Sequence, residues 1–126
     1  MSDGAPAPSM DPLLVAFRDA VRRKIRADLD AEAAVSARLR AERIPQIREV
    51  VAGARAEGVC TRVWLFGSYA WGAPTEASDV DVLVEGDADE VAWRLTRSLG
   101  CEVDAWRLTD APASLAARPM SDGIAL

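Results

Sequence analysis

At 126 residues, half of them hydrophobic, the chain is long enough for one domain with a core and too short for two. Its net charge of −5 is concentrated in residues 59–126, which hold 5 basic and 11 acidic side chains; this balance favours a site that collects cations and argues against binding to a nucleic-acid backbone. Because the chain has no histidine, Ser-His-Asp and Cys-His nucleophilic sites and histidine-ligated zinc sites are excluded.

Residues 1–10 are rich in Ala, Pro, Ser and Gly, which predicts a disordered leader. This stretch lacks the basic and apolar regions of a signal peptide, and no apolar run approaches the roughly 20 residues that cross a bilayer. We therefore expect a cytoplasmic protein that makes no membrane contact.

Residues 11–57 are predicted to form a helical N-terminal extension. Asp11-Pro12 is a typical helix start, and apolar residues then recur at helical spacing to about residue 29. Helical character continues over 31–42, Pro45 is expected to kink or restart it, and Gly58 to end it. The sequence leaves open whether residues 12–43 form one helix or two. The basic run at residues 22–26 is either a solvated face or part of an amphipathic arm that binds a partner or a second copy of the chain.

Residues 58–126 are predicted to form an α+β domain with a small mixed sheet flanked by helices. Short apolar runs bounded by turn residues replace the helical period here. The expected elements in chain order are a strand at 61–66, a turn with a helical turn at 67–71, a strand at 78–85, a helix at 88–99, a strand at 101–108, a short helix at 111–117 and a final strand near 124–126.

Three aspartates are the candidate metal ligands. Asp79 and Asp81 alternate along a predicted strand and therefore point to the same face, and Asp104 lies in the middle of the next strand. At about 4 Å each like-charge pair costs on the order of 4 kcal/mol, so convergence makes sense chiefly around a cation. Oxygen ligands favour Mg²⁺, or Mn²⁺, together with a phosphate-bearing substrate. The alternative is a solvated face with one acid paired to Arg62 or Arg107.

Gly67-Ser68 lies where a predicted strand meets a helical turn, ten residues ahead of Asp79. Glycine allows the backbone to approach a ligand closely, and serine can cap the helical turn while its hydroxyl faces a phosphate oxygen. Beside the aspartates, this turn is a candidate anion site.

The stretch LFGS, ten residues, and then Asp-x-Asp before an apolar strand resembles the signature of the polymerase-β-like nucleotidyltransferases. It is most similar to the minimal nucleotidyltransferases (MNT) that act as antitoxins beside HEPN-type toxins. Asp104 and the tail LTDAPASLAARPMSDGIAL fit the same pattern, and the resemblance covers about residues 58–126.

The resemblance implies a nucleotidyltransferase fold and a protein adenylyltransferase that moves AMP from ATP to a hydroxyl, a tyrosine of the partner toxin in the antitoxins (AMPylation). Gly67 and Ser68 would hold the triphosphate. Asp79 and Asp81 would carry two Mg²⁺ ions, and Asp104 would complete the ion that activates the acceptor hydroxyl.

Relatives often carry an arginine just after Gly-Ser, whereas this chain has Tyr69 and Trp71 nearby, which either pack or stack on a base. Phosphate counter-charges would then come from the arginines of the second half, namely Arg62, Arg94, Arg97, Arg107 and Arg118. Two other functions stay open: nucleotide transfer to a small hydroxyl compound such as an aminoglycoside, and a catalytically silent module that neutralises its partner by contact alone.

Overall fold

The computed structural model describes residues 11–126, so the leader predicted for residues 1–10 lies outside the described residues. The chain divides into two compact units, the first ending at Ala33 and the second running from Ala34 to Leu126. Helix α1, Pro12–Ala56, contributes residues to both units.

Helix α1 begins and continues for identifiable reasons. The Asp11 carboxylate accepts a hydrogen bond of 2.8 Å from the Leu13 amide, which caps the helix as predicted. The prediction left one helix or two open, and the structure has one that passes through Pro45. Ile47 and Val51 beyond the proline are completely buried, so packing stabilises the helix where proline removes a backbone hydrogen bond.

The second unit contains one mixed four-stranded sheet. Its remaining elements are β1 (Cys60–Phe66), the 3₁₀ turn η1 (Gly67–Tyr69), β2 (Val80–Gly86), α2 (Ala88–Leu99), β3 (Val103–Arg107), α3 (Ala113–Asp122) and β4 (Ile124–Ala125). The strand order is β3-β2-β1-β4. Strand β1 pairs antiparallel with β2 and β4, whereas β2 and β3 are parallel. The predicted α+β class with a small mixed sheet and flanking helices is confirmed.

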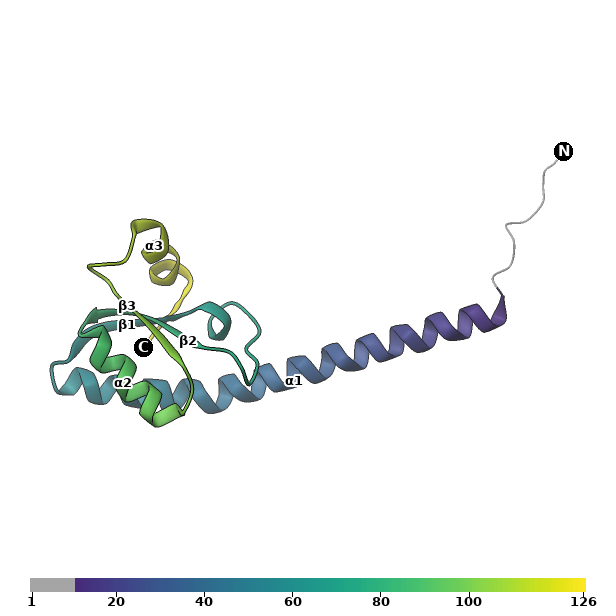
Figure 1. Ribbon diagram of the computed structural model, residues 1–126, viewed down its shortest axis with the longest axis horizontal. Coiled ribbons are helices and arrows are strands. Elements are labelled where there is room, and N and C mark those ends of the chain that lie inside the picture. The colour runs from purple at the N-terminus through teal and green to yellow at the C-terminus, as the bar shows by residue number, and fades with distance from the viewer. Residues whose placement is uncertain (1–10) are drawn as a thin grey trace. The chain divides into compact units, whose positions relative to one another are not determined.

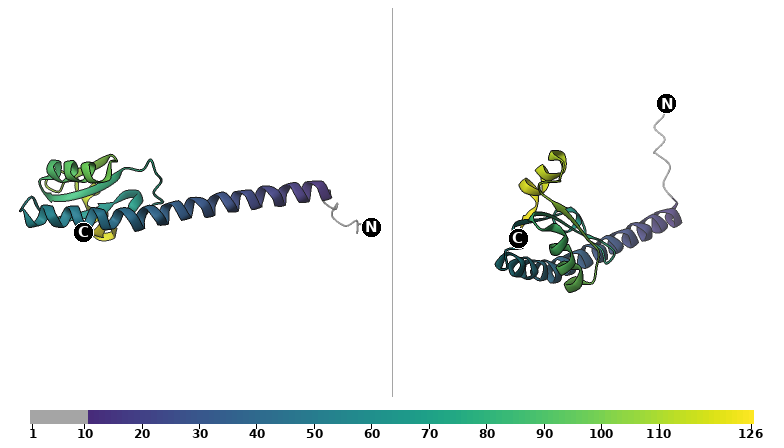
Figure 2. Two further views of the ribbon diagram at one scale, coloured as in Figure 1. Left: turned by 90° about the horizontal axis from the view of Figure 1, so that it is seen from below. Right: turned by 60° about the vertical axis from the view of Figure 1, so that its left-hand side comes forward.

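The core lies between one face of the sheet and two helices. In Figure 1 the part of α1 within the second unit and α2 lie on one side of the sheet and α3 on the other, and Figure 2 gives two further directions. Alternating valines of β2 pack with α1 and α2 residues in one buried cluster. The opposite face therefore carries the residues between the valines, including Asp81.

The capping residues in the sequence predicted the bounds of α2 correctly. The Asp87 side chain accepts a hydrogen bond of 3.1 Å from the Glu90 amide, and Gly100 ends the helix in the left-handed conformation. Three predicted boundaries were wrong: β2 begins at Val80, which leaves Asp79 ahead of the strand, β3 spans only Val103–Arg107, and α3 is displaced to Ala113–Asp122.

Candidate active site

Gly67 and Asp81 lie against each other at the end of the sheet. Phe66 is the register partner of Asp81 across β1 and β2, so η1 starts beside that carboxylate. Gly67 has a φ of +73°, and a Cβ there would lie 3.1 Å from Asp81 Cγ and closer still to Asp81 Oδ2. Glycine is required at this position for its backbone conformation and for space, and it brings the Gly-Ser turn and the Asp-x-Asp motif together.

The second strand pair brings Asp104 to the same place. Asp81 and Asp104 are register partners in the parallel pair of β2 and β3, so their Cβ atoms leave the same face of the sheet. Asp79, on the loop that enters β2, and Asp104 line a hollow of about 440 Å³ together with Glu102. The three predicted aspartates are therefore neighbours, although Asp79 is positioned by a loop and not by the sheet.

The negative charges of the three aspartates are not balanced by ion pairs with other side chains of residues 11–126. Burial, followed by the charges of Asp104 and Asp79, raises the pKa of Asp81 from 3.8 to about 6. Within residues 11–126 none of the three carboxylates forms an ion pair, because Arg62 binds Glu85 and Arg107 lies near Asp110. The alternative of an acid paired with Arg62 or Arg107 is therefore wrong.

The donor set fits a hard divalent cation. Carboxylate oxygens without histidine or thiolate are the ligands that Mg²⁺ and Mn²⁺ prefer, and a cation would offset both the burial and the repulsion that raise the pKa of Asp81. In the part of the chain that the structure describes, no three acidic or thiol side chains are yet close enough to form a metal-ligand set.

The arginines predicted as phosphate counter-charges are mostly committed elsewhere. Arg62 binds Glu85, Arg94 binds Glu57 and Glu90, and Arg97 stacks on Trp93. Arg118 also lies 3.9 Å from Asp122, but in addition its guanidinium lies 4.0 Å from the ring centre of Trp71. The Trp71 amide in turn donates to the Gly67 carbonyl at 3.0 Å. Arg118 is thus the one of the five candidates that contacts the segment following Gly-Ser.

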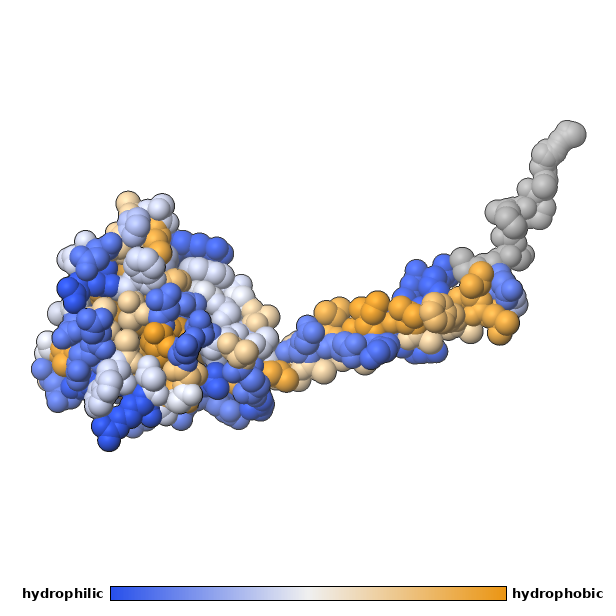
Figure 3. Space-filling model, viewed as in Figure 1, coloured by the Kyte–Doolittle hydropathy of each residue, from blue (hydrophilic) through white to orange (hydrophobic). Residues whose placement is uncertain are grey.

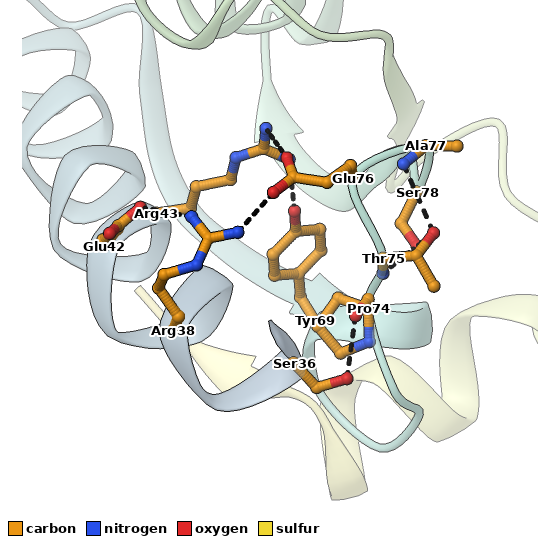
Figure 4. Close-up of polar contacts among 10 residues, drawn as sticks. All are labelled: Ser36, Arg38, Glu42, Arg43, Tyr69, Pro74, Thr75, Glu76, Ala77 and Ser78. Atoms are coloured by element: carbon orange, nitrogen blue, oxygen red, sulfur yellow. Dashed lines mark hydrogen bonds and ion pairs between the residues drawn. The ribbon is translucent and has the colours of Figure 1, made fainter. Parts of the chain in front are cut away.

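The two aromatic residues near the turn have different environments. Tyr69 is 0% exposed and its hydroxyl accepts a hydrogen bond of 2.5 Å from Arg43, as Figure 4 shows, so it packs and is not accessible to a base. Trp71 is partly exposed and lies between Phe66 and Arg118, with ring centres of Phe66 and Trp71 6.2 Å apart.

The sequence interpretation missed two arginines of α1 that contact the Gly-Ser segment. Arg40 donates to the carbonyls of Ser68 and Tyr69, and Arg43 to the Tyr69 hydroxyl. A signal was present: positions 36, 40, 43 and 47 share one face of a helix, and only the last is apolar. Polar residues that interrupt a core-facing stripe indicate a buried polar network.

Among residues 11–126, no helix combines the length and the apolar character needed to cross a bilayer.

Comparisons with known proteins agree with this geometry. No curated protein matches the chain. One chain of a mutant of the toxin–antitoxin MntA-HpeT is 26% identical, with a TM-score of 0.51 over 63% of this chain and 69% of that chain. A structure designated a minimal nucleotidyltransferase is 27% identical, with a TM-score of 0.56 over 65% and 90%. A toxin–antitoxin solved with AMP-PNP, 24% identical with a TM-score of 0.54 over 63% and 70%, has the same fold.

These similarities confirm the resemblance to minimal nucleotidyltransferases that was inferred from the sequence. The profile of the family described as "Nucleotidyltransferase domain" matches residues 44–115, more than half of the chain. The protein therefore belongs to the nucleotidyltransferase domain family.

Proposed function

We propose that this nucleotidyltransferase transfers AMP from ATP to a tyrosine hydroxyl of a HEPN-type toxin and thereby acts as an antitoxin. The observation that carries the proposal is the contact of Gly67 with Asp81, because it places a candidate phosphate-binding turn directly beside a cluster of carboxylates. The similarity to a chain of the toxin–antitoxin MntA-HpeT supports a toxin as the partner.

Each group in the site has a proposed role. Asp79, Asp81 and Asp104 hold two Mg²⁺ ions, which when bound lower the pKa of the acceptor hydroxyl and neutralise the leaving pyrophosphate. Gly67 lets the backbone of the turn lie directly against Asp81, and Ser68 donates its hydroxyl to a phosphate oxygen. Arg118 supplies the positive charge that the segment after Gly-Ser lacks.

The direct test is label transfer. Incubation with α-labelled ATP, Mg²⁺ and the proposed HEPN-type partner toxin should label a tyrosine of that toxin. Asp79→Ala should abolish transfer, whereas Asp110→Ala should not, because Asp110 is an exposed aspartate whose nearest charge partner is Arg107. Absence of transfer to the genuine partner in the presence of Mg²⁺ would refute the proposal.

The same variants separate catalysis from contact alone. If a protein lacking the Asp79 and Asp81 carboxylates still protects cells from the toxin, the chain is a silent binding module. Transfer to an aminoglycoside in place of the toxin would instead identify a small-molecule enzyme. Either result would replace the adenylyltransferase antitoxin.

We also propose that residues 12–33 of α1 carry a surface for an oligomeric contact, with the toxin or with a second copy of the chain. Figure 3 shows apolar residues gathered along this part of the helix. The exposed residues at helical spacing are Leu13, Leu14, Phe17, Val21, Ile25 and Leu29, with exposures from 40% to 78%. An apolar stripe of this length is typical of a helix that binds another helix or a groove.

Substitution distinguishes this surface from a solvated face. Phe17→Asp together with Ile25→Asp should prevent the contact, whereas Arg23→Asp, on the polar face, should preserve it. Light scattering of the chain alone and mixed with the toxin identifies the occupant. A monomer in both measurements would refute the oligomeric role.

A further inference from the structure

One partly buried arginine of α1, Arg40, binds the segment between the Gly-Ser turn and Asp79. Arg40 Nε donates to the Tyr69 carbonyl at 3.3 Å, and Arg40 Nη2 donates to the Ser68 carbonyl at 3.4 Å and also to the Gly72 carbonyl. A single half-buried guanidinium thus binds three carbonyls of the turn. A planar group with five N–H donors is suited to this role, and lysine is not.

Further contacts continue the attachment along the segment. Arg43 Nη1 donates to the hydroxyl of the fully buried Tyr69 at 2.5 Å. The buried Ser36 hydroxyl donates to the Pro74 carbonyl at 2.8 Å, and Arg38 forms an ion pair with Glu76. Figure 4 shows these side chains of α1 meeting the segment. The segment therefore has partners on α1 from η1 to within a few residues of β2.

Two parts of the candidate site depend on this attachment and two do not. Asp81 and Asp104 are fixed by the ladder between β2 and β3. Ser68 and Asp79 lie in η1 and in the loop before β2, where no strand pairing holds them. Residues 67–79 contain no lysine or arginine, so the cationic groups that contact this segment come from other elements. Arginines of α1 bind its carbonyls and the Tyr69 hydroxyl, and Arg118 of α3 stacks on Trp71.

We propose that Arg40 and Arg43 are positioning residues of the active site, acting through the segment 67–79. Arg40 binds the backbone of the turn so that Ser68 is held at the position where a phosphate binds. Arg43 anchors the Tyr69 side chain, which keeps the same turn against α1. The proposal rests on the proposed nucleotidyl transfer, but the attachment itself is measurable without a substrate.

The test compares Arg40→Ala with Arg55→Ala. Arg55 lies on the same helix and also donates to two carbonyls, those of Thr61 and Leu126, at 2.9 and 2.6 Å, away from the segment. In Arg40→Ala, amide hydrogen exchange of residues 67–79 should become at least several-fold faster, and Mn²⁺ binding should weaken, while Arg55→Ala leaves both unchanged. The kcat of transfer should fall on the order of 10- to 100-fold in Arg40→Ala alone.

Two milder variants keep the test interpretable if Arg40→Ala does not fold. Arg40→Lys keeps the charge but reaches fewer carbonyls, so its exchange and kcat should lie between those of the wild type and Arg40→Ala. Tyr69→Phe removes only the hydroxyl that Arg43 binds, and it should speed exchange of the turn with the global unfolding midpoint close to that of the wild type.

The outcomes separate the two proposals. Unchanged exchange in Arg40→Ala, or equal changes in Arg40→Ala and Arg55→Ala, would overturn the positioning role. If exchange and Mn²⁺ affinity respond as expected but the wild type transfers no nucleotide to the toxin, the positioning role stands and the proposed function fails.

Discussion

Replacement of Gly67 by alanine tests the contact on which the candidate site depends. Gly67 has a φ of +73°, a conformation that costs an L residue about 1–2 kcal/mol. The new Cβ would also meet the Asp81 carboxylate, with Cγ at 3.1 Å and Oδ2 nearer. Because Asp81 is a half-buried residue of a paired strand, its side chain must rotate away, which should cost about 1 kcal/mol more.

Gly58→Ala is the matched control, because Gly58 has a φ of +76° with no atom within 4 Å of the added Cβ. It should lose only the backbone contribution, about 1 kcal/mol, or about 4 °C in midpoint for a chain of this size. Gly67→Ala should lose about 2 kcal/mol. In the double variant Gly67→Ala with Asp81→Ala, the collision with Cγ and Oδ2 is absent and only the Cβ at 3.3 Å remains, so the coupling between the two positions should be about 1 kcal/mol.

Urea unfolding followed by far-UV circular dichroism measures the free energies of unfolding of the wild type, Gly67→Ala, Asp81→Ala, the double variant and Gly58→Ala. Nucleotide transfer should fall at least about tenfold in Gly67→Ala and remain near wild type in Gly58→Ala, because only the first displaces a proposed metal ligand. Equal stability losses in the two single variants, with no coupling to Asp81, would refute the close approach of the turn to the carboxylate.

Three further predictions concern the same domain. In metal-free protein, the pKa of Asp81 is raised to about 6. The free energy of unfolding should therefore be highest below about pH 4 and should fall as the pH rises to 6 and Asp81 ionises. Asp81→Asn should therefore be more stable than the wild type at pH 7 by about 1 kcal/mol, after allowance for solvent screening, and no more stable at pH 4; equal urea midpoints at pH 7 would contradict this. Added Mg²⁺ or Mn²⁺ should raise the thermal midpoint of the wild type in proportion to the logarithm of concentration but not that of Asp79→Ala with Asp81→Ala, and an identical shift in both would place the ion elsewhere. Asp87→Ala, which removes the cap bonded to the Glu90 amide, should cost about 1 kcal/mol in thermal unfolding, whereas a loss below about 0.3 kcal/mol would show that the cap contributes little.

Local patterns in the sequence predicted the elements and the face of the sheet that carries Asp81. The caps at Asp11 and Asp87 were identified from single side chains next to apolar periodicity, and both are present. The two-residue period of β2 placed Asp81 on the face opposite the valines, and Asp104 is its partner on β3. These features are accessible because a cap, a helical stripe and a strand alternation depend on residues only a few positions apart.

Other features of the site depend on residues far apart in the chain. The family resemblance named Gly67, Ser68 and the three aspartates, but the contact of Gly67 with Asp81 requires the antiparallel pairing of β1 with β2. The start of β2 at Val80 leaves Asp79 on a loop, a boundary that the alternation of side chains did not mark.

The sequence by itself determined the fold class, the family and which carboxylates are candidates for metal binding. Only the tertiary structure decided that Tyr69 is core and that Arg40 and Arg43 hold the turn. The physical reason is that an arginine on a helix has the same local pattern whether it is solvated or bound. Its partners here lie 26 to 32 residues away along the chain, and packing of α1 against the sheet brings them together.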